Sequence, residues 1–371
     1  MPRVMGIVTP AASNMRIEGM NRFRPIAAFS FLGRYRIVDF PVSNLSNSDI
    51  EHIQVYVSQN PRSLAEHLGT GRTYNINSKR GKLQLLFNQD SRVNDIYNTD
   101  IRAYADNMDQ IELASEPYVV ITPGYMIFQQ DYRELLNEHL SSGADVTILY
   151  HKVNNADKSF RNCSIVTLNR QKGVKSIERN TGKVPECNIF MDTYVMTREL
   201  FIKLIYKAQK TSSVYRLVDI INDENDELDI RGMAHKGYFT AVTDFKSYFD
   251  ANIELLDFDR VRELFSDEWP IYTVTTDSCP VRYCKGSKIR NSMVANGCVV
   301  EGEVEDCVIG RGVEIRQGAV VKNCVILGHA IIGKGVHLEG QVVDKWAKVL
   351  NVKEIIAPPD NPGYITRGDT L

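Results

Sequence analysis

The chain has almost no net charge and no long apolar run. Its 371 residues include 44 Lys and Arg against 46 Asp and Glu, which gives a formal net charge of -2. This balance provides no electrostatic attraction for nucleic acid or an anionic membrane, and neither is expected as a partner. No apolar stretch approaches the ~18 residues of a membrane span, and the short one near the N-terminus predicts a strand rather than a signal peptide.

Cysteine is sparse as well. The seven Cys residues are scattered and odd in number, which predicts reduced thiols and a cytoplasmic protein. Cys279 and Cys284 lack the neighbouring Cys or His pair that a zinc site needs. What remains is an ordinary globular composition, with 43% hydrophobic and 24% charged residues, in a chain long enough for two domains.

Strand-like and helical patterns alternate over roughly the first 250 residues. This alternation is typical of an α/β, Rossmann-like domain with a mostly parallel sheet. We expect that domain to occupy residues 1–250 and a helical linker to occupy residues 251–283. The expected strands cover 4–9, 53–57, 118–121, 146–150, 164–168 and 188–196, and the expected helices cover 61–68, 101–111, 133–142, 198–210, 217–224 and 245–264.

The C-terminal part of the chain repeats every six positions. Apolar residues recur at Ile309, Ile315 and Val321, and the pattern resumes after a one-residue slip at Ile332 and Leu338. Each is followed four positions later by another apolar residue, at Val313, Ala319, Val325, Val336 and Val342. This period predicts a left-handed parallel β-helix over 284–371. A β-sandwich of short strands is the alternative, although hairpins usually recur at about 8–12 residues.

One block of sequence is long and specific. Residues 33–48 read Gly-Arg-Tyr-Arg-Ile-Val-Asp-Phe-Pro-Val-Ser-Asn-Leu-Ser-Asn-Ser. This block resembles the G-K-[FY]-R-I-[IV]-D-F-x-[LV]-S-N-x-x-N-S motif of bacterial glucose-1-phosphate adenylyltransferases (ADP-glucose pyrophosphorylases). Residues 53–59, Gly237-Tyr238 and 343–345 continue the resemblance, which covers essentially the whole chain. Active members of that family join ATP and glucose 1-phosphate into ADP-glucose and pyrophosphate.

The resemblance fails at the two positions where the family carries metal-binding aspartates. The segment 118–132 matches a strand end that the family writes G-D-x-I-Y-x-x-D-Y, and here the first aspartate is Tyr125. The second aspartate, in G-Y-W-x-D-V-G-T, falls on Ala241. Phosphoryl transfer uses carboxylates to hold the divalent ion that neutralises charge between phosphates. A phenol and a methyl group cannot replace them, so no metal site is expected in this chain.

The phosphate-binding loop departs from the family as well. The family opens with L-A-G-G-x-G-T-R-L, and its glycines let backbone N–H groups approach the triphosphate. Counting back without gaps from Asp39-Phe40, the three glycines fall on Ala11, Ala12 and Asn14, whereas Arg16 retains its charge. The lysine of the family's R-A-K-P block becomes Ile26. The loop is therefore degenerate.

The sugar-phosphate pocket is altered too. The family's F-x-E-K-P block falls on residues 176–180, where Glu178 is kept and Arg179 keeps a positive charge without the compact ammonium. The S-M-G block falls near Phe190-Met191-Asp192, where a bulky side chain and a carboxylate would crowd a phosphosugar. The nucleotide block G-T-A-D-A falls near residues 99–103.

Taken as a whole, the resemblance is nearest to the noncatalytic GlgD type of subunit found beside a catalytic subunit in some Gram-positive bacteria. It implies a noncatalytic or weakly catalytic regulatory subunit of glycogen biosynthesis. Such a subunit acts by assembling with the catalytic adenylyltransferase in a hetero-oligomer, expected to be a tetramer. No cofactor is expected on this chain, and Mg²⁺ is expected only in the catalytic partner.

Other functions remain open from the sequence. An active nucleotidyltransferase with a rearranged metal site would draw its ligands from Asp100, Asp106 or Asp131, which we expect to face solvent instead. A hexapeptide-repeat acyltransferase would use His329 or His337 as a base, against the simpler interpretation of surface or turn histidines. A scaffold or sensor with a vestigial sugar-nucleotide pocket is a third class.

A basic cluster suggests an effector site. Arg24, Arg34 and Arg36 match a stretch that, in relatives, lines an anion-binding cleft between the domains, and Lys345 matches a block that could close it. Arginine forks suit phosphate, so the resemblance implies a small phosphorylated effector. The alternative is a set of solvated or structural arginines that pair with Asp39.

Overall fold

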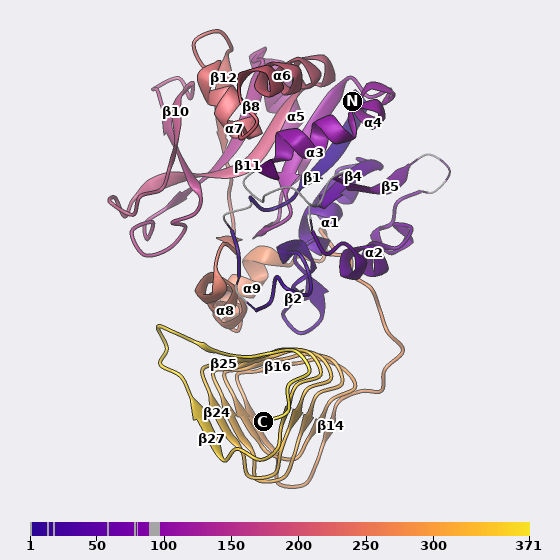
Figure 1. Cartoon of the computed structure of the whole chain (residues 1–371), viewed down its shortest axis with the longest axis vertical. Coiled ribbons are helices and arrows are strands. Elements are labelled where there is room, and N and C mark those ends of the chain that lie inside the picture. Colours follow the sequence, from indigo (N-terminus) through magenta and orange to yellow (C-terminus); the bar gives the residue numbers. More distant parts are fainter. Residues whose placement is uncertain are drawn as a thin grey trace.

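A nine-stranded sheet lies between two layers of helices, and a triangular stack of short strands lies below it (Figure 1). The computed structural model describes residues 2–12, 15–17, 19–57, 59–77, 79, 81–88 and 97–371. In this part of the chain, no helix is both long and apolar enough to cross a membrane. The predicted order, an α/β domain followed by a left-handed parallel β-helix, is confirmed.

An interior strand of the sheet, β1 (Val4–Thr9), is apolar and buried along nearly its whole length. It pairs in parallel with β4 (His52–Val57) on one side and with β6 (Tyr118–Pro123) on the other. Beyond β4, the edge strand β5 (Lys82–Phe87) is parallel as well. The carboxyl ends of β1, β4 and β6 therefore meet at one edge, which is where α/β sheets usually bind ligands.

The other half of the sheet is antiparallel around its longest strand, so the sheet as a whole is mixed. This strand, β11 (Cys187–Thr197), runs antiparallel to β6 and to β8 (Val146–Val153). The remaining strands on this side are β9 (Ser164–Leu168), β10 (Val174–Arg179) and β12 (Ile230–Ala234).

Side chains alternate along the strands, so each face of the sheet carries apolar residues. Helices cover both faces. Ile7 of β1 belongs to one buried cluster, and Val8 belongs to the other. The face of Ile7 is covered by α3 (Asp100–Asp106), α4 (Met108–Glu112), α6 (Arg198–Thr211) and α7 (Leu217–Asp223). The face of Val8 is covered by α1 (Asp39–Asn47), α2 (Arg62–Leu68), α5 (Tyr132–Ser142), α8 (Phe245–Glu254) and α9 (Phe258–Leu264).

Most of the predicted strands and helices are confirmed within a few residues, with two interruptions. The predicted helix over 101–111 breaks at Asn107, whose side-chain amide donates to the carbonyl of Ala103 (2.9 Å). The predicted helix over 245–264 breaks between Glu254 and Phe258. β5, β10 and β12 were not predicted, because their short and partly polar sequences carry a weak alternation.

The β-helix has three flat sides, each a five-stranded parallel sheet. Glu314 pairs with Ile331 and Ile331 with Lys348, so these coils hold 17 residues, one fewer than three hexapeptides. This missing residue explains the one-residue slip in the period. The predicted inward residues Ile309, Ile315, Val321, Ile332 and Leu338 are all 0% exposed.

The three sides share a simple order, because successive coils place one strand on each side. The first side contains β14 (Arg282–Tyr283), β17 (Val299–Val300), β20 (Glu314–Ile315), β23 (Ile331–Ile332) and β26 (Lys348–Val349). The second contains β15 (Lys288–Arg290), β18 (Glu303–Glu305), β21 (Val320–Lys322), β24 (His337–Glu339) and β27 (Glu354–Ile356). The third contains β16 (Met293–Val294), β19 (Val308–Ile309), β22 (Val325–Ile326), β25 (Gln341–Val343) and β28 (Gly363–Ile365).

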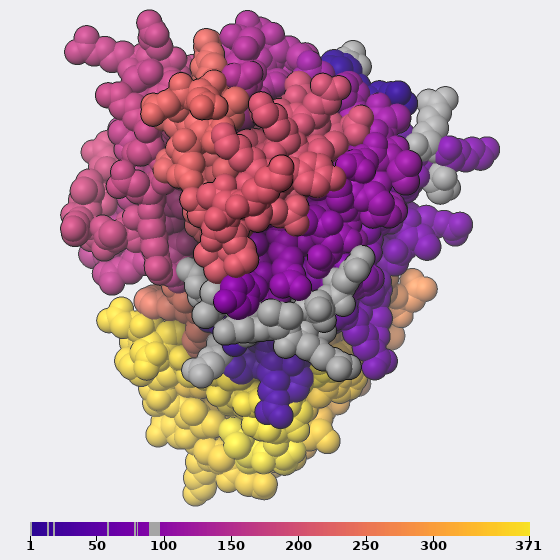
Figure 2. Space-filling model, turned by 45° about the horizontal axis from the view of Figure 1, so that its top comes forward, coloured from indigo at the N-terminus to yellow at the C-terminus, as the bar shows by residue number. Residues whose placement is uncertain are grey.

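The two domains share one apolar core at their junction. Val308, Val325 and Val342 on the third side of the β-helix join the cluster that contains α8 and α9. These helices lie between the sheet and the β-helix (Figure 1). The predicted boundary at residue 250 falls inside α8, which spans Phe245–Glu254. In the space-filling view, the yellow β-helix lies directly against the indigo N-terminal part of the chain (Figure 2).

Candidate functional site

The structure brings Tyr125 and Ala241 together at the carboxyl end of β6. The short strands β7 (Met126–Phe128) and β13 (Phe239–Ala241) pair antiparallel, with Ala241 opposite Met126. The backbone N–H of Val242 donates to the carbonyl of Tyr125 (2.9 Å). The two positions belong to separate sequence motifs, and the fold places them side by side.

The Tyr125 phenol is buried and bonded to a carboxylate. Its hydroxyl donates to Oδ2 of Asp192, and the tyrosine is 2% exposed. Asp192 reaches it because the pairing of β11 with β8 shifts register at this point and Asp192 takes a left-handed φ of 44°. Burial raises the pKa of Tyr125 well above its usual range, and it also raises the pKa of Asp192. The phenol therefore stays neutral and acts as a donor.

A cavity of about 350 Å³ opens beside this pair. Its polar lining includes Asp100, Arg179, Asp192, Arg216 and Asp219. Burial raises the pKa of Asp100 to about 6, and its Oδ1 accepts the backbone N–H groups of residues 101 (2.8 Å) and 217 (3.1 Å). The cavity therefore has several carboxyl groups but holds them in hydrogen bonds and close to a guanidinium.

Asp100, which we expected to face solvent, is half-buried in the wall of this cavity, where its carboxylate is held by two backbone N–H groups. Asp106 lies 3.9 Å from Arg102, and Asp131 caps α5 and accepts from Arg133 (2.8 Å). Across the described residues, no group of three or more His, Cys, Asp or Glu is placed to hold a metal ion. The side chains at Tyr125 and Ala241 provide none of the carboxylate oxygens that Mg²⁺ prefers, so these two positions cannot supply the ligands of the family motif.

The degenerate loop lies next to the cavity. Ala11 and Ala12 line it, and with Arg16 and Ile26 they also line a small neighbouring pocket of about 70 Å³. Ile26, at the start of the 3₁₀ helix η1 (Ile26–Ala28), is 3% exposed and closes that pocket with an aliphatic side chain. Asn14 lies outside the described residues.

The two charged residues kept from the sugar-phosphate block are not brought together. Both lie on β10, where successive side chains point to opposite faces. Arg179 lines the cavity and donates to Oδ1 of Asn162 (3.2 Å), whereas Glu178 is exposed and is absent from the lining. Only the positive charge of that block remains available at the site.

Comparison with known proteins agrees with this architecture. Residues 15–255 match the model of the nucleotidyl transferase family, and residues 281–359 match that of the GlmU-like C-terminal hexapeptide. A glycogen biosynthesis protein GlgD of Geobacillus stearothermophilus is 31% identical over 86% of this chain and 83% of its own length. The chain belongs to the bacterial glucose-1-phosphate adenylyltransferase family.

Other relatives span nearly the same length. A glycogen biosynthesis protein GlgD of Bacillus subtilis is 26% identical over 99% of this chain and 96% of its own length. A glucose-1-phosphate adenylyltransferase of Clostridium perfringens is 28% identical over 87% of this chain and 83% of its own length. The relatives thus include proteins with both names.

Residues 33–48, the block that carries the family resemblance, pack against the sheet and do not line the cavity of Asp100 and Asp192. Oδ1 of Asp39 accepts from the ring Nε2 of His67 (2.6 Å) and the hydroxyl of Tyr74 (2.6 Å). The amide of Asn44 donates to the carbonyl of Phe128 (2.9 Å) and its oxygen accepts from the Trp269 indole (2.9 Å). The block therefore holds helices, strand ends and the segment after α9 in one arrangement.

The predicted effector residues divide into two groups. Arg24 is 2% exposed, and its Nη2 bonds to Oδ1 of Asp344 in the β-helix (2.7 Å). Arg34, Arg36 and Lys345 instead line a cavity of about 270 Å³ between the domains. The backbone N–H of Arg36, not its guanidinium, bonds to Asp39 (2.8 Å).

Arg311 is a further cation in this interdomain cavity, and it was not predicted. No motif marks its position, because tertiary packing brings it into the same cavity as Arg34. Burial, Arg36 and Arg24 lower the pKa of Lys345 to about 7. The cavity is therefore a concentration of positive charge.

The two β-helix histidines lie apart and are both engaged. The ring of His329 stacks on Trp346, with centroids 4.2 Å apart, at a corner of the helix. His337 is on β24 and its Nδ1 lies 3.0 Å from Glu354. They do not form a shared pocket.

Proposed function

We propose that this chain is a regulatory subunit, noncatalytic or weakly catalytic, of glucose-1-phosphate adenylyltransferase in glycogen biosynthesis. The observation that carries the proposal is the hydrogen bond from Tyr125 to Asp192, beside Ala241. It fills, with a neutral phenol, the place where the family motif provides a metal-binding carboxylate. This arrangement supports the proposal that the chain itself holds no metal ion at this position.

Several separate losses support the same conclusion. The glycine loop, the lysine position at Ile26 and both metal aspartates are replaced. Removing one group that stabilises a developing charge typically costs on the order of 10²–10³ in rate. Losses of this kind are not additive, but together they leave little phosphoryl-transfer chemistry.

In this proposal the chain acts through assembly. The β-helix and the block of residues 33–48 keep the shape of a family subunit, and a catalytic adenylyltransferase subunit provides the chemistry and holds Mg²⁺. Both would reside in the cytoplasm, in a hetero-oligomer that we expect to be a tetramer. The chain would shift the partner's active conformation through their interface, which is a coupling free energy between sites.

Restoring the two aspartates tests how the chemistry was lost. The double variant Tyr125→Asp, Ala241→Asp should make no ADP-glucose, because the glycine loop and the lysine at Ile26 are still absent. Its folding is checked by circular dichroism, and Mg²⁺ binding by calorimetry reports whether a metal site has formed. ADP-glucose synthesis by this variant alone, at a normal enzyme rate, would show that the metal ligands were the sole defect.

The rearranged metal site is the second candidate, because Asp100, Asp192 and Asp219 line one cavity. Two facts weigh against it: burial raises the pKa of Asp100 and Asp192, and Arg216 lies among them. Titration of the wild-type chain with Mg²⁺ or Mn²⁺ separates the two proposals. Saturable binding that Asp100→Asn abolishes would favour the rearranged site.

We further propose that the interdomain cavity of Arg34, Arg36, Arg311 and Lys345 binds a small phosphorylated effector. Burial, together with the neighbouring Arg36 and Arg24, lowers the pKa of Lys345, and an anion bound in the cavity would favour its charged form. Inorganic phosphate should raise the melting temperature of the wild-type chain more than that of Lys345→Met. Equal shifts in the two proteins would leave these residues with a structural role only.

A further inference from the structure

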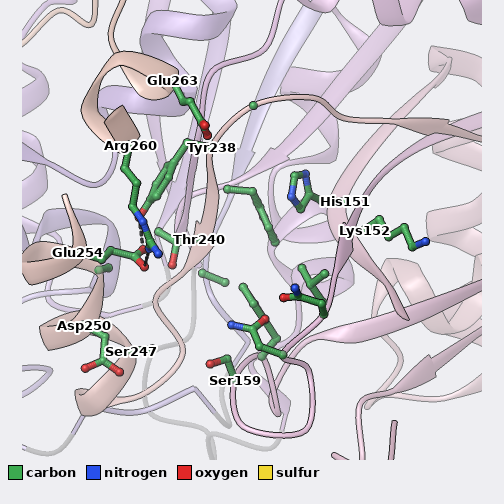
Figure 3. A pocket seen from close by; sticks show the side chains of 18 of the residues that line it. His151, Lys152, Ser159, Tyr238, Thr240, Ser247, Asp250, Glu254, Arg260 and Glu263 are labelled. Carbon is green, nitrogen blue, oxygen red and sulfur yellow. Dashed lines mark hydrogen bonds and ion pairs between the residues drawn. The ribbon is translucent and has the colours of Figure 1, made fainter. Parts of the chain in front are cut away.

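A larger cavity, about 860 Å³, borders the site described above at Ala241 and extends away from it. It is bounded by the end of β8, by β13 and by helices α8 and α9 (Figure 3). It shares no lining residue with the cavity of Asp100 and Asp192. Its size is within the range of roughly 300–1,000 Å³ that small-molecule sites occupy.

One wall of the cavity presents a carboxylate held in place from two sides. The hydroxyl of Tyr238 donates to Oε1 of Glu254, and Nη1 of Arg260 donates to Oε2 (2.5 Å) (Figure 3). Tyr238 is 7% exposed, so its ring fixes the donor. A carboxylate with a fixed orientation keeps lone pairs that hydroxyl groups of a ligand can reach.

The opposite wall presents His151, whose tautomer is set by its hydrogen bond to His235. Nε2 of His235 lies 3.0 Å from the carbonyl of Gln129, so it must carry a hydrogen and donate. Nδ1 of His235 then accepts from Nδ1 of His151 (3.1 Å). Burial lowers the pKa of His235 to about 4, which keeps this ring neutral. The neutral His151 ring, which lines the cavity, is left with Nε2 as an acceptor.

Aromatic rings form the base between these walls. Phe239 stacks on Phe160 with centroids 5.4 Å apart and an interplanar angle of 9°. The ring of His151 lies 5.2 Å from Phe239. An apolar ring surface bordered by carboxylate, hydroxyl and amide groups suits a ligand that has both C–H faces and hydroxyls.

The charges of the lining argue against a phosphate ligand. Lys152 pairs with Glu186 (2.5 Å), and Arg260 pairs with Glu254 (2.5 Å). These are the two formally charged cations among the lining residues of this cavity, and each is already held by a carboxylate. The remaining acids of the lining include Glu263, which lies close enough to His151 to interact with it electrostatically. An anionic ligand would be repelled, whereas a neutral one would not.

We propose that this cavity binds a neutral oligosaccharide. A sugar ring would lie against Phe160, which is half-buried and is backed by the buried Phe239, and its hydroxyls would donate to Glu254, Glu263 and Nε2 of His151. This inference does not rest on the regulatory role proposed above: the cavity adjoins the replaced metal position at Ala241, but its polar contacts come from other residues. A chain without catalytic chemistry could carry such a site, and so could an active enzyme.

Calorimetric titration of the whole chain with maltotriose tests the proposal. We expect saturable binding that weakens roughly tenfold in Glu263→Gln, the effect of losing a hydrogen bond to a charged group. The matched control is Asp259→Asn, an exposed acid on the same helix that is absent from the lining. It should bind maltotriose like the wild-type chain.

A second variant, which fills the cavity with a bulky side chain, tests whether maltotriose binds there. Asn155 is exposed and lines the cavity, so Asn155→Trp should fill it without disturbing the core and should abolish binding. Absence of binding to the wild-type chain, or binding that neither variant changes, would overturn the proposal. Competition by ADP-glucose, or binding of spermidine in place of maltotriose, would assign the cavity to a nucleotide sugar or a cation and overturn it as well.

Discussion

The carboxyl end of the sheet departs from the family motifs, whereas the junction with the β-helix follows them. At the sheet end, the positions that carry chemistry in the family motif hold Tyr125, Ala241 and the alanines of the loop. At the junction, Arg24 still meets Asp344 at 2.7 Å and Gly33 still allows close approach to the backbone of the β-helix. The difference indicates that the junction residues that match the family hold the two domains together, whereas the positions of the family's metal ligands are replaced.

The comparison predicts that substitutions at the junction cost more stability than substitutions at the old catalytic positions. The largest effect is expected for Arg24→Met, because it leaves Asp344 buried without its charge partner. Breaking a buried pair in this way costs about 3–5 kcal/mol. Urea unfolding measures the loss, and Arg22→Met, at an exposed neighbouring position, should change little. Equal effects of the two variants would show that the Arg24–Asp344 pair does not stabilise the junction.

Gly33→Ala should have the next largest effect. Gly33 has a φ of 68°, and a Cβ there would lie 2.6 Å from the carbonyl oxygen of Ile309. Backbone strain of this kind costs of order 1–3 kcal/mol, and the clash adds to it. Gly143→Ala is the matched control, since Gly143 has a φ of 66° and nothing within 4 Å of its Cβ position. The difference between the two melting temperatures measures the domain contact alone.

Tyr125→Phe tests the other region. The variant removes the donor to Asp192 and leaves a buried carboxyl oxygen without it, which costs about 1–3 kcal/mol. Tyr132→Phe, which loses a bond from the phenol to the neutral hydroxyl of Thr122 (2.8 Å), should cost less. A gain of stability in Tyr125→Phe would mean that the Tyr125–Asp192 bond does not stabilise this site.

The pH dependence of Asp100 gives the smallest expected effect. Burial raises its pKa to about 6, so between roughly pH 4 and that value the folded state binds more protons than the unfolded state. Stability therefore falls as pH rises through this window, and the cost is complete above it. Asp100→Asn should melt about 2–4 °C higher at pH 7.5, the shift that ~1 kcal/mol gives a domain of this size. The difference should vanish near pH 4.

The sequence predicts the repetitive parts of the fold well and the contacts at the site less well. The six-residue period predicts the β-helix because each coil repeats the same inward positions, such as Ile309 and Ile315. The motif comparison finds Tyr125 and Ala241, but not the bond from Tyr125 to Asp192, which depends on a register shift in β11. Arg216 and Arg311 were not predicted, because tertiary packing alone brings them to their cavities.

Mixing this chain with its proposed catalytic partner, an active glucose-1-phosphate adenylyltransferase, tests the central claim most directly. ADP-glucose formation is measured for each protein alone and for the mixture, with gel filtration to detect their complex. The proposal predicts negligible activity for this chain alone and a mixture whose turnover or effector response exceeds the sum of its parts. A normal enzyme rate from this chain alone, or a mixture that behaves as the sum, would contradict it.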